Sequence, residues 1–345
     1  MSAVTIVDTY YYGALCFKLL KTTSDCAQHP TVTLKALPGT LILGGGAYVD
    51  WDGPCSPPSP PGNLLTAMYP NDTGTTWTVA SKDHLEVSKA RVVAYCIVAQ
   101  MKDGTPISAE NYRIANGTSA VAAHPTLQVD LPAGFTVVGG GARANYGGVG
   151  NMLFASYPTA GLGGWVGSAK DHLQSDPATI TVWAIGLKES FLKNAGMLVS
   201  SFDSTSSPAA NHPRHTFVVP DFHLTGAGAR VNWSGLGSLL TASYPQDRQT
   251  VVAEGKDHIQ ADPSTITAYA IGFVGWWQLH WLWVKMALGF SFSKSCTNCL
   301  VKIIRAVWTL FMRYGLVTRK RSRRLKVDFV LIKTSLSILS KSKWS

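Results

Sequence analysis

One block of eight residues occurs three times in this chain and divides it into similar units of about 90 residues. It reads GGGAYVDW at 44–51, GGGARANY at 139–146 and GAGARVNW at 226–233. Every copy is preceded by His-Pro and followed by an apolar run that ends in Tyr-Pro, and then by Lys-Asp-His. Self-similarity at a fixed period is typical of repeat architectures, so the sequence predicts three copies of one structural unit.

The composition of each unit indicates β structure. The segment 179–187, TITVWAIGL, alternates residues in steps of two and is rich in β-branched side chains, which is typical of strands. Tyr-Pro and Gly-Gly turn signals recur at short intervals, as antiparallel strands joined by tight turns require. We expect an all-β fold of three tandem antiparallel units, with about five strands each and pseudo-threefold repetition. A prism-like or propeller-like ring is favoured, and a linear row of three β modules is the alternative.

The markers also set the domain boundaries. The first 28 residues resemble the end of a connector whose own unit is absent, and in a closed ring this strand would lie beside the end of the third unit. A basic, Trp-rich tail outside the repeat follows the last unit. The expected segments are the partial connector at 1–28, the units at 29–123, 124–211 and 212–273, and the tail at 274–345.

Differences in spacing between the copies locate two loops. The first copy has seven extra residues within the proline-rich stretch 52–62, and the third copy lacks one residue after its Tyr-Pro. Insertions and deletions are tolerated where the backbone is exposed and unpaired. Both segments are therefore expected to be surface loops.

The basic charge belongs to the tail. The whole chain has a formal net charge of +10, with 30 basic and 20 acidic residues, but 14 of the basic residues and only Asp328 among the acids follow Phe273. The body therefore holds 16 basic and 19 acidic groups, which makes nucleic-acid binding by the body unlikely. For the tail, possible readings are membrane contact through 274–326, nucleic-acid binding, or an unselected extension.

The six cysteines do not repeat with the units, so no repeated disulfide or zinc framework is expected. This favours a reducing compartment or indifference to redox. The N-terminus lacks the basic start and long apolar stretch of a signal peptide, which is compatible with a cytoplasmic body.

The Lys-Asp-His motif supplies the first group of candidate ligand-binding residues. It pairs an acid with an imidazole in all three units, and the histidines of His-Pro (His29, His124 and His212) could join the pairs in space. A turn in which the aspartate accepts backbone N–H bonds is the structural alternative. The candidates are Asp83, His84, Asp171, His172, Asp257 and His258.

The end of the glycine block supplies the second group. An Asx residue beside an aromatic ring suits a sugar, because the polar group can bond hydroxyls while the ring packs against C–H groups. The alternative is that the rings anchor the core and the glycines permit a β-bulge or a crowded strand crossing. The candidates are Asp50, Trp51, Asn145, Tyr146, Asn232 and Trp233.

These patterns favour a non-catalytic binding protein over an enzyme. Active sites are normally single, whereas three equivalent sites suit multivalent binding. The expected ligand is a glycan or another small polar molecule, bound in a lectin-like manner at up to three related sites. No cofactor or metal motif is present in the sequence. The alternatives are a structural or toxin-like protein whose tail associates with membrane and, third, a hydrolase that uses one Asp-His pair.

Overall fold

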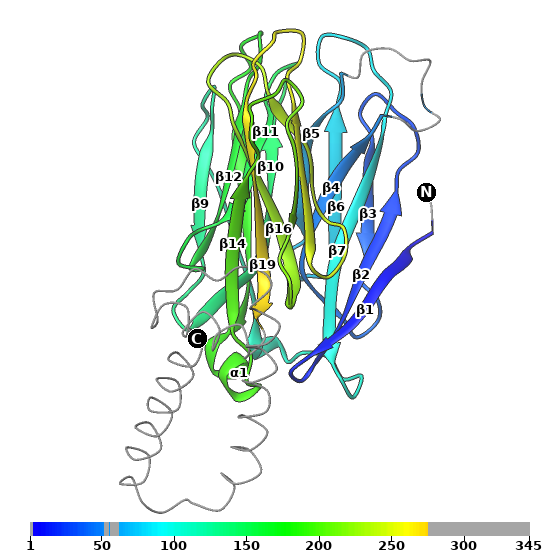
Figure 1. Cartoon of the computed structure of the whole chain (residues 1–345), viewed down its shortest axis with the longest axis vertical. Helices are drawn as coiled ribbons and strands as arrows, with labels where there is room; N and C mark the ends of the chain where they lie inside the picture. Colours follow the sequence, from blue (N-terminus) through cyan, green and yellow to red (C-terminus); the bar gives the residue numbers. More distant parts are fainter. Residues whose placement is uncertain (1–2, 52–54, 56–61, 275–345) are drawn as a thin grey trace, which may run out of the picture. The chain divides into compact units, whose positions relative to one another are not determined.

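A computed structural model describes residues 3–51, 55 and 62–274, and the tail predicted at 274–345 therefore lies almost entirely outside the described residues. The described chain is almost entirely β structure in three antiparallel sheets (Figure 1). The short 3₁₀ helix η1 (Ala109–Asn111) and the helix α1 (Glu189–Asn194) are its helical elements. This confirms the all-β class and the threefold repetition expected from the sequence.

The strands are as follows, in the order in which they lie side by side. The first sheet is β1 (Thr5–Tyr12), β2 (Leu15–Thr23), β7 (Arg91–Met101), β4 (Leu41–Asp50), β17 (Leu239–Pro245), β18 (Thr250–Lys256) and β15 (Arg214–Val218). The second is β3 (Thr31–Lys35), β6 (Thr76–Lys82), β5 (Leu64–Pro70), β10 (Phe135–Asn145), β13 (Thr179–Lys188) and β8 (Tyr112–Thr118). The third is β14 (Val199–Thr205), β19 (Thr265–Val274), β16 (Phe222–Asn232), β11 (Met152–Pro158), β12 (Gly164–Lys170) and β9 (Thr126–Asp130).

Each sheet is shared between two units. The glycine strand of every unit pairs with the Tyr-Pro strand of the preceding unit: β10 with β5, β16 with β11, and β4 of the first unit with β17 of the third. The last of these pairings closes the ring. A linear row of independent modules is therefore excluded. The fold is a three-sided prism in which each sheet combines strands of two units.

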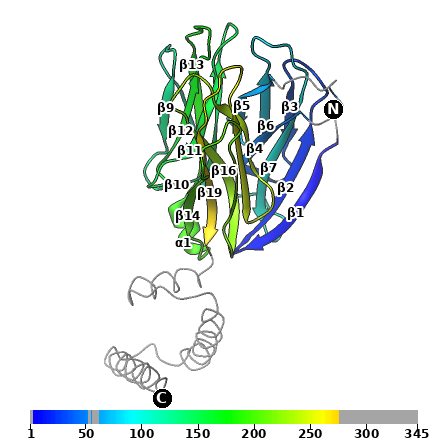
Figure 2. The same ribbon diagram turned by 45° about the horizontal axis from the view of Figure 1, so that its top comes forward.

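The N-terminal strand has a different place from the one expected. β2 pairs with β7 of the first unit, just as β8 pairs with β13 and β14 with β19. It is thus the connector strand of the first unit, and the β4–β17 pair closes the ring instead. β1 adds an outer edge strand beside β2 (Figure 2). Contact with the third unit is made by side chains, since the hydroxyls of Tyr10 and Tyr12 donate to the carbonyls of Leu224 and Val274.

The first glycine of each block lies where the three glycine strands converge. A β-carbon on Gly44 would approach the Cα of Gly226 to 2.9 Å, one on Gly139 would approach the Cα of Gly44 to 2.9 Å, and one on Gly226 would approach the Cα of Gly139 to 3.2 Å. A β-bulge occurs at the same point in all three strands. The bulge and crowded-crossing interpretation of the glycine block is therefore correct at this position.

The second position of the block accommodates a tryptophan. The ring of Trp77 packs on Gly45 and that of Trp165 on Gly140, and both rings are fully buried. The third unit has Ala227 in place of the glycine and Val251 in place of the tryptophan. The added methyl is thus tolerated where the large ring is absent, and neither tryptophan can contact an external ligand.

The third glycine of the block allows the tyrosine of the preceding unit's Tyr-Pro motif to approach closely. A β-carbon on Gly46 would clash with the backbone of Tyr244, one on Gly141 with that of Tyr69, and one on Gly228 with that of Tyr157. Each tyrosine ring then stacks on an aromatic ring of the neighbouring unit's closing strand, with centroids 4.5–4.8 Å apart. These pairs are Tyr244–Tyr95, Tyr69–Trp183 and Tyr157–Tyr269.

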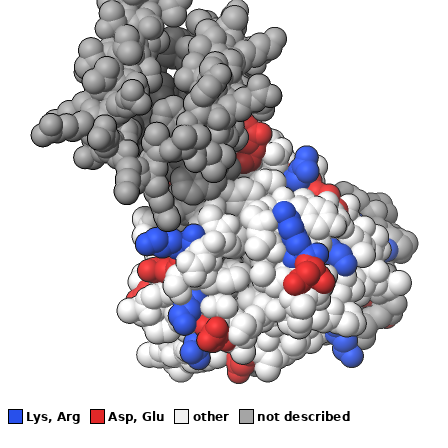
Figure 3. Space-filling view, turned by 90° about the horizontal axis from the view of Figure 1, so that it is seen from below, with Lys and Arg blue, Asp and Glu red and all other residues white. Residues whose placement is uncertain are grey.

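The body has a weakly charged surface on the face seen in Figure 3, where lysine, arginine and acidic side chains are scattered as small groups of both signs. This agrees with the near-balanced charge of the repeat region. In residues 3–51, 55 and 62–274, no helix is long and apolar enough to cross a membrane.

The convergence of the glycine strands predicts a large effect of adding one methyl group. We expect Gly139→Ala to lower the free energy of unfolding by about 3 kcal/mol, because the new β-carbon would meet the backbone of Leu43 and Gly44 and could not be relieved by a side-chain rotation. Urea unfolding of the variant measures this. Gly161→Ala is the matched control, since nothing lies within 4 Å of its β-carbon position. Equal urea midpoints for Gly139→Ala and Gly161→Ala would contradict the close approach of the glycine strands.

Candidate functional site at the apical end

All twelve sequence candidates lie at one end of the prism, which we call the apical end (upper part of Figure 1). It is formed by the loops that join β2 to β3, β4 to β5 and β6 to β7, and by their counterparts in the other two units. The Asx-aromatic pairs end the glycine strands, and the Lys-Asp-His motifs follow β6, β12 and β18. The two groups of candidates are therefore brought together in space.

The histidine of each His-Pro lies within hydrogen-bond distance of the aspartate of Lys-Asp-His. Nε2 of His29, His124 and His212 lies 2.9, 3.1 and 3.0 Å from an Oδ1 atom, of Asp83, Asp171 and Asp257 respectively. The histidine side chains are 50–67% exposed and the aspartates 13–16%. The second oxygen of Asp83 and Asp171 accepts a backbone N–H five residues on, so the aspartate also closes its own turn.

The histidines of Lys-Asp-His have a different place from the one expected for ligand-binding residues. His84, His172 and His258 are 1–3% exposed and lie around the pseudo-threefold axis, with ring centroids 5.2–5.5 Å apart. We call these three residues the axial histidine cluster. Because these three histidines are buried, an external ligand cannot reach them. The histidines of His-Pro are instead the exposed ones, as had been expected for the histidines of Lys-Asp-His.

The axial histidine cluster is joined by hydrogen bonds to backbone carbonyls. His172 Nε2 lies 2.6 Å from the carbonyl oxygen of His258, and His258 Nε2 contacts that of His84. The third contact, from His84 Nε2 toward His172, falls short of hydrogen-bond geometry. The Nδ1 atoms of His84 and His172 lie 2.6 and 2.7 Å from the carbonyls of Val149 and Leu236, in the loop of the next unit.

Burial keeps the imidazoles of this cluster neutral. Desolvation is the main cause that lowers the pKa of His84 and His172, and it lowers the pKa of His258 to about 4. Neighbouring charges add to the effect, because two imidazolium ions at this separation repel each other by about 3 kcal/mol at an effective dielectric constant of about 20. A neutral imidazole has one N–H, so it can donate only one of the two bonds that its surroundings offer.

The lysine of each motif reaches across a unit boundary. Nζ of Lys82 donates to the carbonyls of Gly148, Val149 and Gly150, and Nζ of Lys170 donates to those of Leu236 and Gly237. Both side chains are 1% exposed. Desolvation lowers the pKa of each to about 8, against the opposing effect of nearby aspartates, so both remain charged at neutral pH.

The same lysines lie over the aromatic rings of the Asx-aromatic pairs. Lys82 Nζ is 4.2 Å from the ring centroid of Tyr146, Lys170 Nζ is 3.9 Å from that of Trp233, and Lys256 Nζ is 5.6 Å from that of Trp51. Each contact joins one unit to the next around the ring. It follows that one face of each predicted ligand-binding ring is already occupied by an ammonium group.

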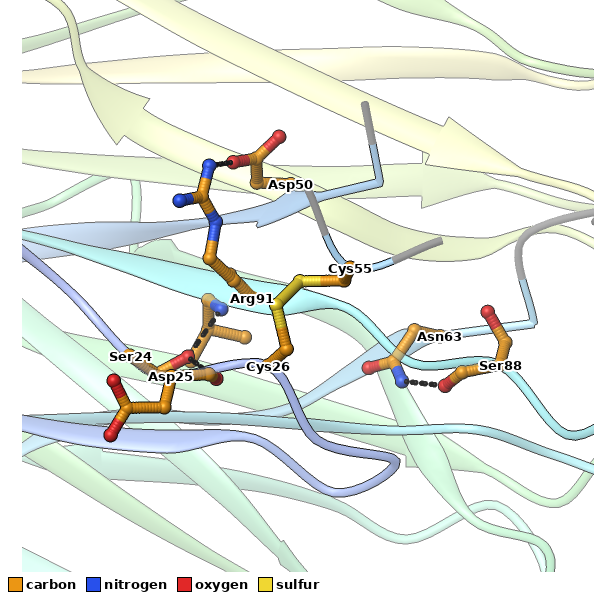
Figure 4. The surroundings of a disulfide bond; sticks show 9 residues. Ser24, Asp25, Cys26, Asp50, Cys55, Asn63, Ser88 and Arg91 are labelled. Atoms are coloured by element: carbon orange, nitrogen blue, oxygen red, sulfur yellow. Dashed lines mark hydrogen bonds and ion pairs between the residues drawn. A yellow bond between two sulfur atoms is a disulfide. The ribbon is translucent and has the colours of Figure 1, made fainter. Parts of the chain in front are cut away.

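The Asx side chains pair with the closing strand. Asn145 donates to the hydroxyls of Thr179 and Thr181, and Asn232 donates in the same way to those of Thr265 and Thr267. In the first unit Asp50 accepts a hydrogen bond from Arg91 instead (Figure 4). The three Asx groups are therefore engaged within the sheets, which favours a structural contribution at this position.

Sequence reasoning did not select two further residues that organise the apical end. Asn63 donates to the carbonyls of Gln28 and Ser88, and Asn151 donates to those of Ala123 and Asp176. Each side chain thus ties the His-Pro loop to the Lys-Asp-His loop of its own unit. The polar residue that begins an otherwise apolar strand, as in NLLTAMYP and NMLFASYP, was the available signal.

A disulfide bond joins Cys26 to Cys55 at the apical end (Figure 4). It fastens the first unit's connector to the proline-rich insertion, most of which lies outside the described residues. Both cysteines occur in the first unit alone, so the expectation that no disulfide framework repeats still holds, but the inference of a reducing compartment is not supported. Cys16 and Cys96 are buried free thiols.

Three apolar side chains project from the apical end. Leu85, Leu173 and Ile259 directly follow the axial histidines and are 50%, 42% and 60% exposed. Their φ angles of 60°, 56° and 62° lie in the left-handed region, which is unfavourable for leucine and more so for β-branched isoleucine. The backbone N–H of the following residue bonds to the carbonyl of the histidine, which gives each unit a rare, strained form of γ-turn.

The described cavities do not coincide with these residues. One of about 380 Å³ is lined by Thr40, Asp72 and Tyr112, among others, and one of about 430 Å³ lies beside α1. Both belong to the opposite end of the prism. No group of three or more acidic, histidine or cysteine side chains within the described ranges is arranged to hold a metal ion.

Comparison with known proteins adds no family to this picture. No protein-family model matches the chain, and no curated protein matches it significantly.

The lysine contacts predict a strong dependence of stability on the buried ammonium group. We expect Lys170→Met to lower the free energy of unfolding by about 3 kcal/mol, because the carbonyls of Leu236 and Gly237 would lose a charged donor in a buried site. Urea unfolding at pH 7 measures the change. Lys89→Met is the control, since Lys89 is exposed on an apical loop. A loss no greater than that of the control would show that the ammonium group contributes little.

Proposed function

We propose that this protein is a non-catalytic binding protein whose apical end binds carbohydrate at three related sites. Each site lies at a junction between units and combines an exposed histidine, its aspartate partner and a partly exposed aromatic ring. The three junction sites are His29, Asp83 and Tyr146; His124, Asp171 and Trp233; and His212, Asp257 and Trp51.

The main support is the second junction site, where the parts are in direct contact. The imidazole of His124 lies edge-on to the ring of Trp233, with centroids 5.5 Å apart, and its Nε2 atom pairs with Asp171. An exposed imidazole can bond a sugar hydroxyl, while the neighbouring ring edge and the projecting Leu173 offer apolar surface to C–H groups.

The threefold arrangement favours binding over catalysis. The three histidine–aspartate pairs have nearly equal distances and face the same end of the prism. A reaction needs one competent site, whereas three weak sites on one surface gain affinity for a multivalent ligand such as a glycan-bearing surface. Asp83 and Asp171 also close their own turns, which gives them a structural contribution that a catalytic base does not need.

A glycan array with the full chain, followed by titration calorimetry of the best ligand, tests this proposal. We expect His124→Ala to weaken binding to a multivalent glycan surface about tenfold, because one of three sites is lost, and the triple variant with His29→Ala and His212→Ala to abolish it. Glu110→Ala, on the exposed η1 at the opposite end, is the control and should bind as the unaltered protein does. If the full chain retains no glycan, or the triple variant binds normally, the proposal is wrong.

A further inference from the structure

The axial histidine cluster has no part in the proposed junction sites, yet its three titratable side chains are buried at the apical end. Three imidazoles from three separate units meet within 5.5 Å, and each of the two well-formed contacts joins a ring nitrogen to a histidine carbonyl of another unit. The hydrogen bonds therefore link three loops that are otherwise far apart in sequence.

The carbonyls in this ring of contacts are those of the strained γ-turns. The oxygen of His258 accepts the N–H of Gln260 and lies 2.6 Å from Nε2 of His172, and the oxygen of His84 accepts the N–H of Glu86 and contacts Nε2 of His258. Left-handed backbone at a leucine or isoleucine persists only where surrounding contacts enforce it. The histidine contacts enforce two of the three turns, because they hold the carbonyls of His258 and His84 at which those turns close.

The charges around the cluster oppose the uptake of protons. Lys82, Lys170 and Lys256 carry positive charge beside His84, His172 and His258 respectively. The residues 147–151 and 234–238, which cover His84 and His172, contain no charged side chain. Gly62 lies beside His258 in the first unit.

The aspartates near the cluster interact mainly with groups other than the axial histidines. Asp83, Asp171 and Asp257 pair with the exposed histidines, and Asp171 alone among them favours the charged form of its axial neighbour. Asp176 and Asp262 act on Lys82 and Lys170. The side chain of Glu86 is exposed to solvent. An imidazolium within the cluster would therefore meet one ammonium group and the neighbouring imidazoles, and its compensation would come from the backbone carbonyls that its nitrogens contact.

We propose that the axial histidine cluster is an acid-sensitive latch, which holds the three apical γ-turns closed at neutral pH and lets them open together when its imidazoles gain protons.

The direction of the effect follows from linkage. Burial lowers the pKa of the cluster in the folded protein, with that of His258 at about 4, whereas an exposed histidine titrates near 6.5. The open form therefore binds more protons than the closed form between these values. The latch contributes fully above about pH 6.5 and is progressively lost as the pH falls toward 4. Opening releases Leu85, Leu173 and Ile259 from their left-handed conformation.

Hydrogen exchange of the full chain at pH 7.5 and 5.0, corrected for intrinsic exchange rates, tests the latch. We expect protection of 83–90, 171–178 and 257–264 to fall at least tenfold at the lower pH, while β13 and β19 remain protected. His258→Gln should reduce this pH effect to less than half, because glutamine keeps a donor but does not titrate in this range. Lys89→Gln is the control, since Lys89 is exposed on an apical loop and belongs to no junction site. It should respond as the unaltered protein does.

Equal apical protection at both pH values, a uniform loss over the whole body, or an unchanged pH effect in His258→Gln would overturn the proposal. If His258→Gln fails to fold, ring NMR of the unaltered protein decides. The three axial imidazoles should then titrate below about pH 6.5, the ordinary value of a histidine. Axial titration at or above that value would also overturn the latch.

Discussion

The fold depends on the close approach of three backbones at the pseudo-threefold axis. Gly44, Gly139 and Gly226 let the glycine strands converge so far that a single methyl group on any of them would meet the next strand. From this point each strand runs outward to pair with a Tyr-Pro strand of the preceding unit. The ring closure, the stacked aromatic pairs and the apical loops all follow from a geometry that only glycine permits at the centre.

Because each sheet contains strands of two units, polar contacts at the apical end cross unit boundaries. Lys82 and Lys170 leave one unit and end among the backbone carbonyls of the next, beneath an aromatic ring. Because these ammonium groups are buried and donate hydrogen bonds to the next unit, they link neighbouring units. The exposed histidines are consequently the polar groups at the junctions that remain accessible to a ligand.

The sequence was sufficient for the repeat, the strand content and the expectation that the histidines of His-Pro join the Lys-Asp-His motifs in space. It was insufficient for the partners of each strand, because a hairpin such as β5–β6 has the same alternating pattern whether it pairs within its own unit or with the next. The burial of the individual histidines could not be predicted from the sequence either. His29 and His84 both sit beside an apparent turn, and only the threefold arrangement directs one outward and the other to the axis. The Cys26–Cys55 bond was missed because neither its loop length nor its position could be compared with a second copy.

The shared sheets have a consequence for the linkers between the units. A single unit on its own would present its glycine strand and its Tyr-Pro strand as two unpaired edges on different half-sheets, since their partners belong to its neighbours. Three identical separate chains would satisfy those edges in the same way as the three linked units do. The covalent linkers are therefore not what completes the sheets, and they leave each copy free to carry its own side chain at an equivalent position, as Trp77, Trp165 and Val251 do.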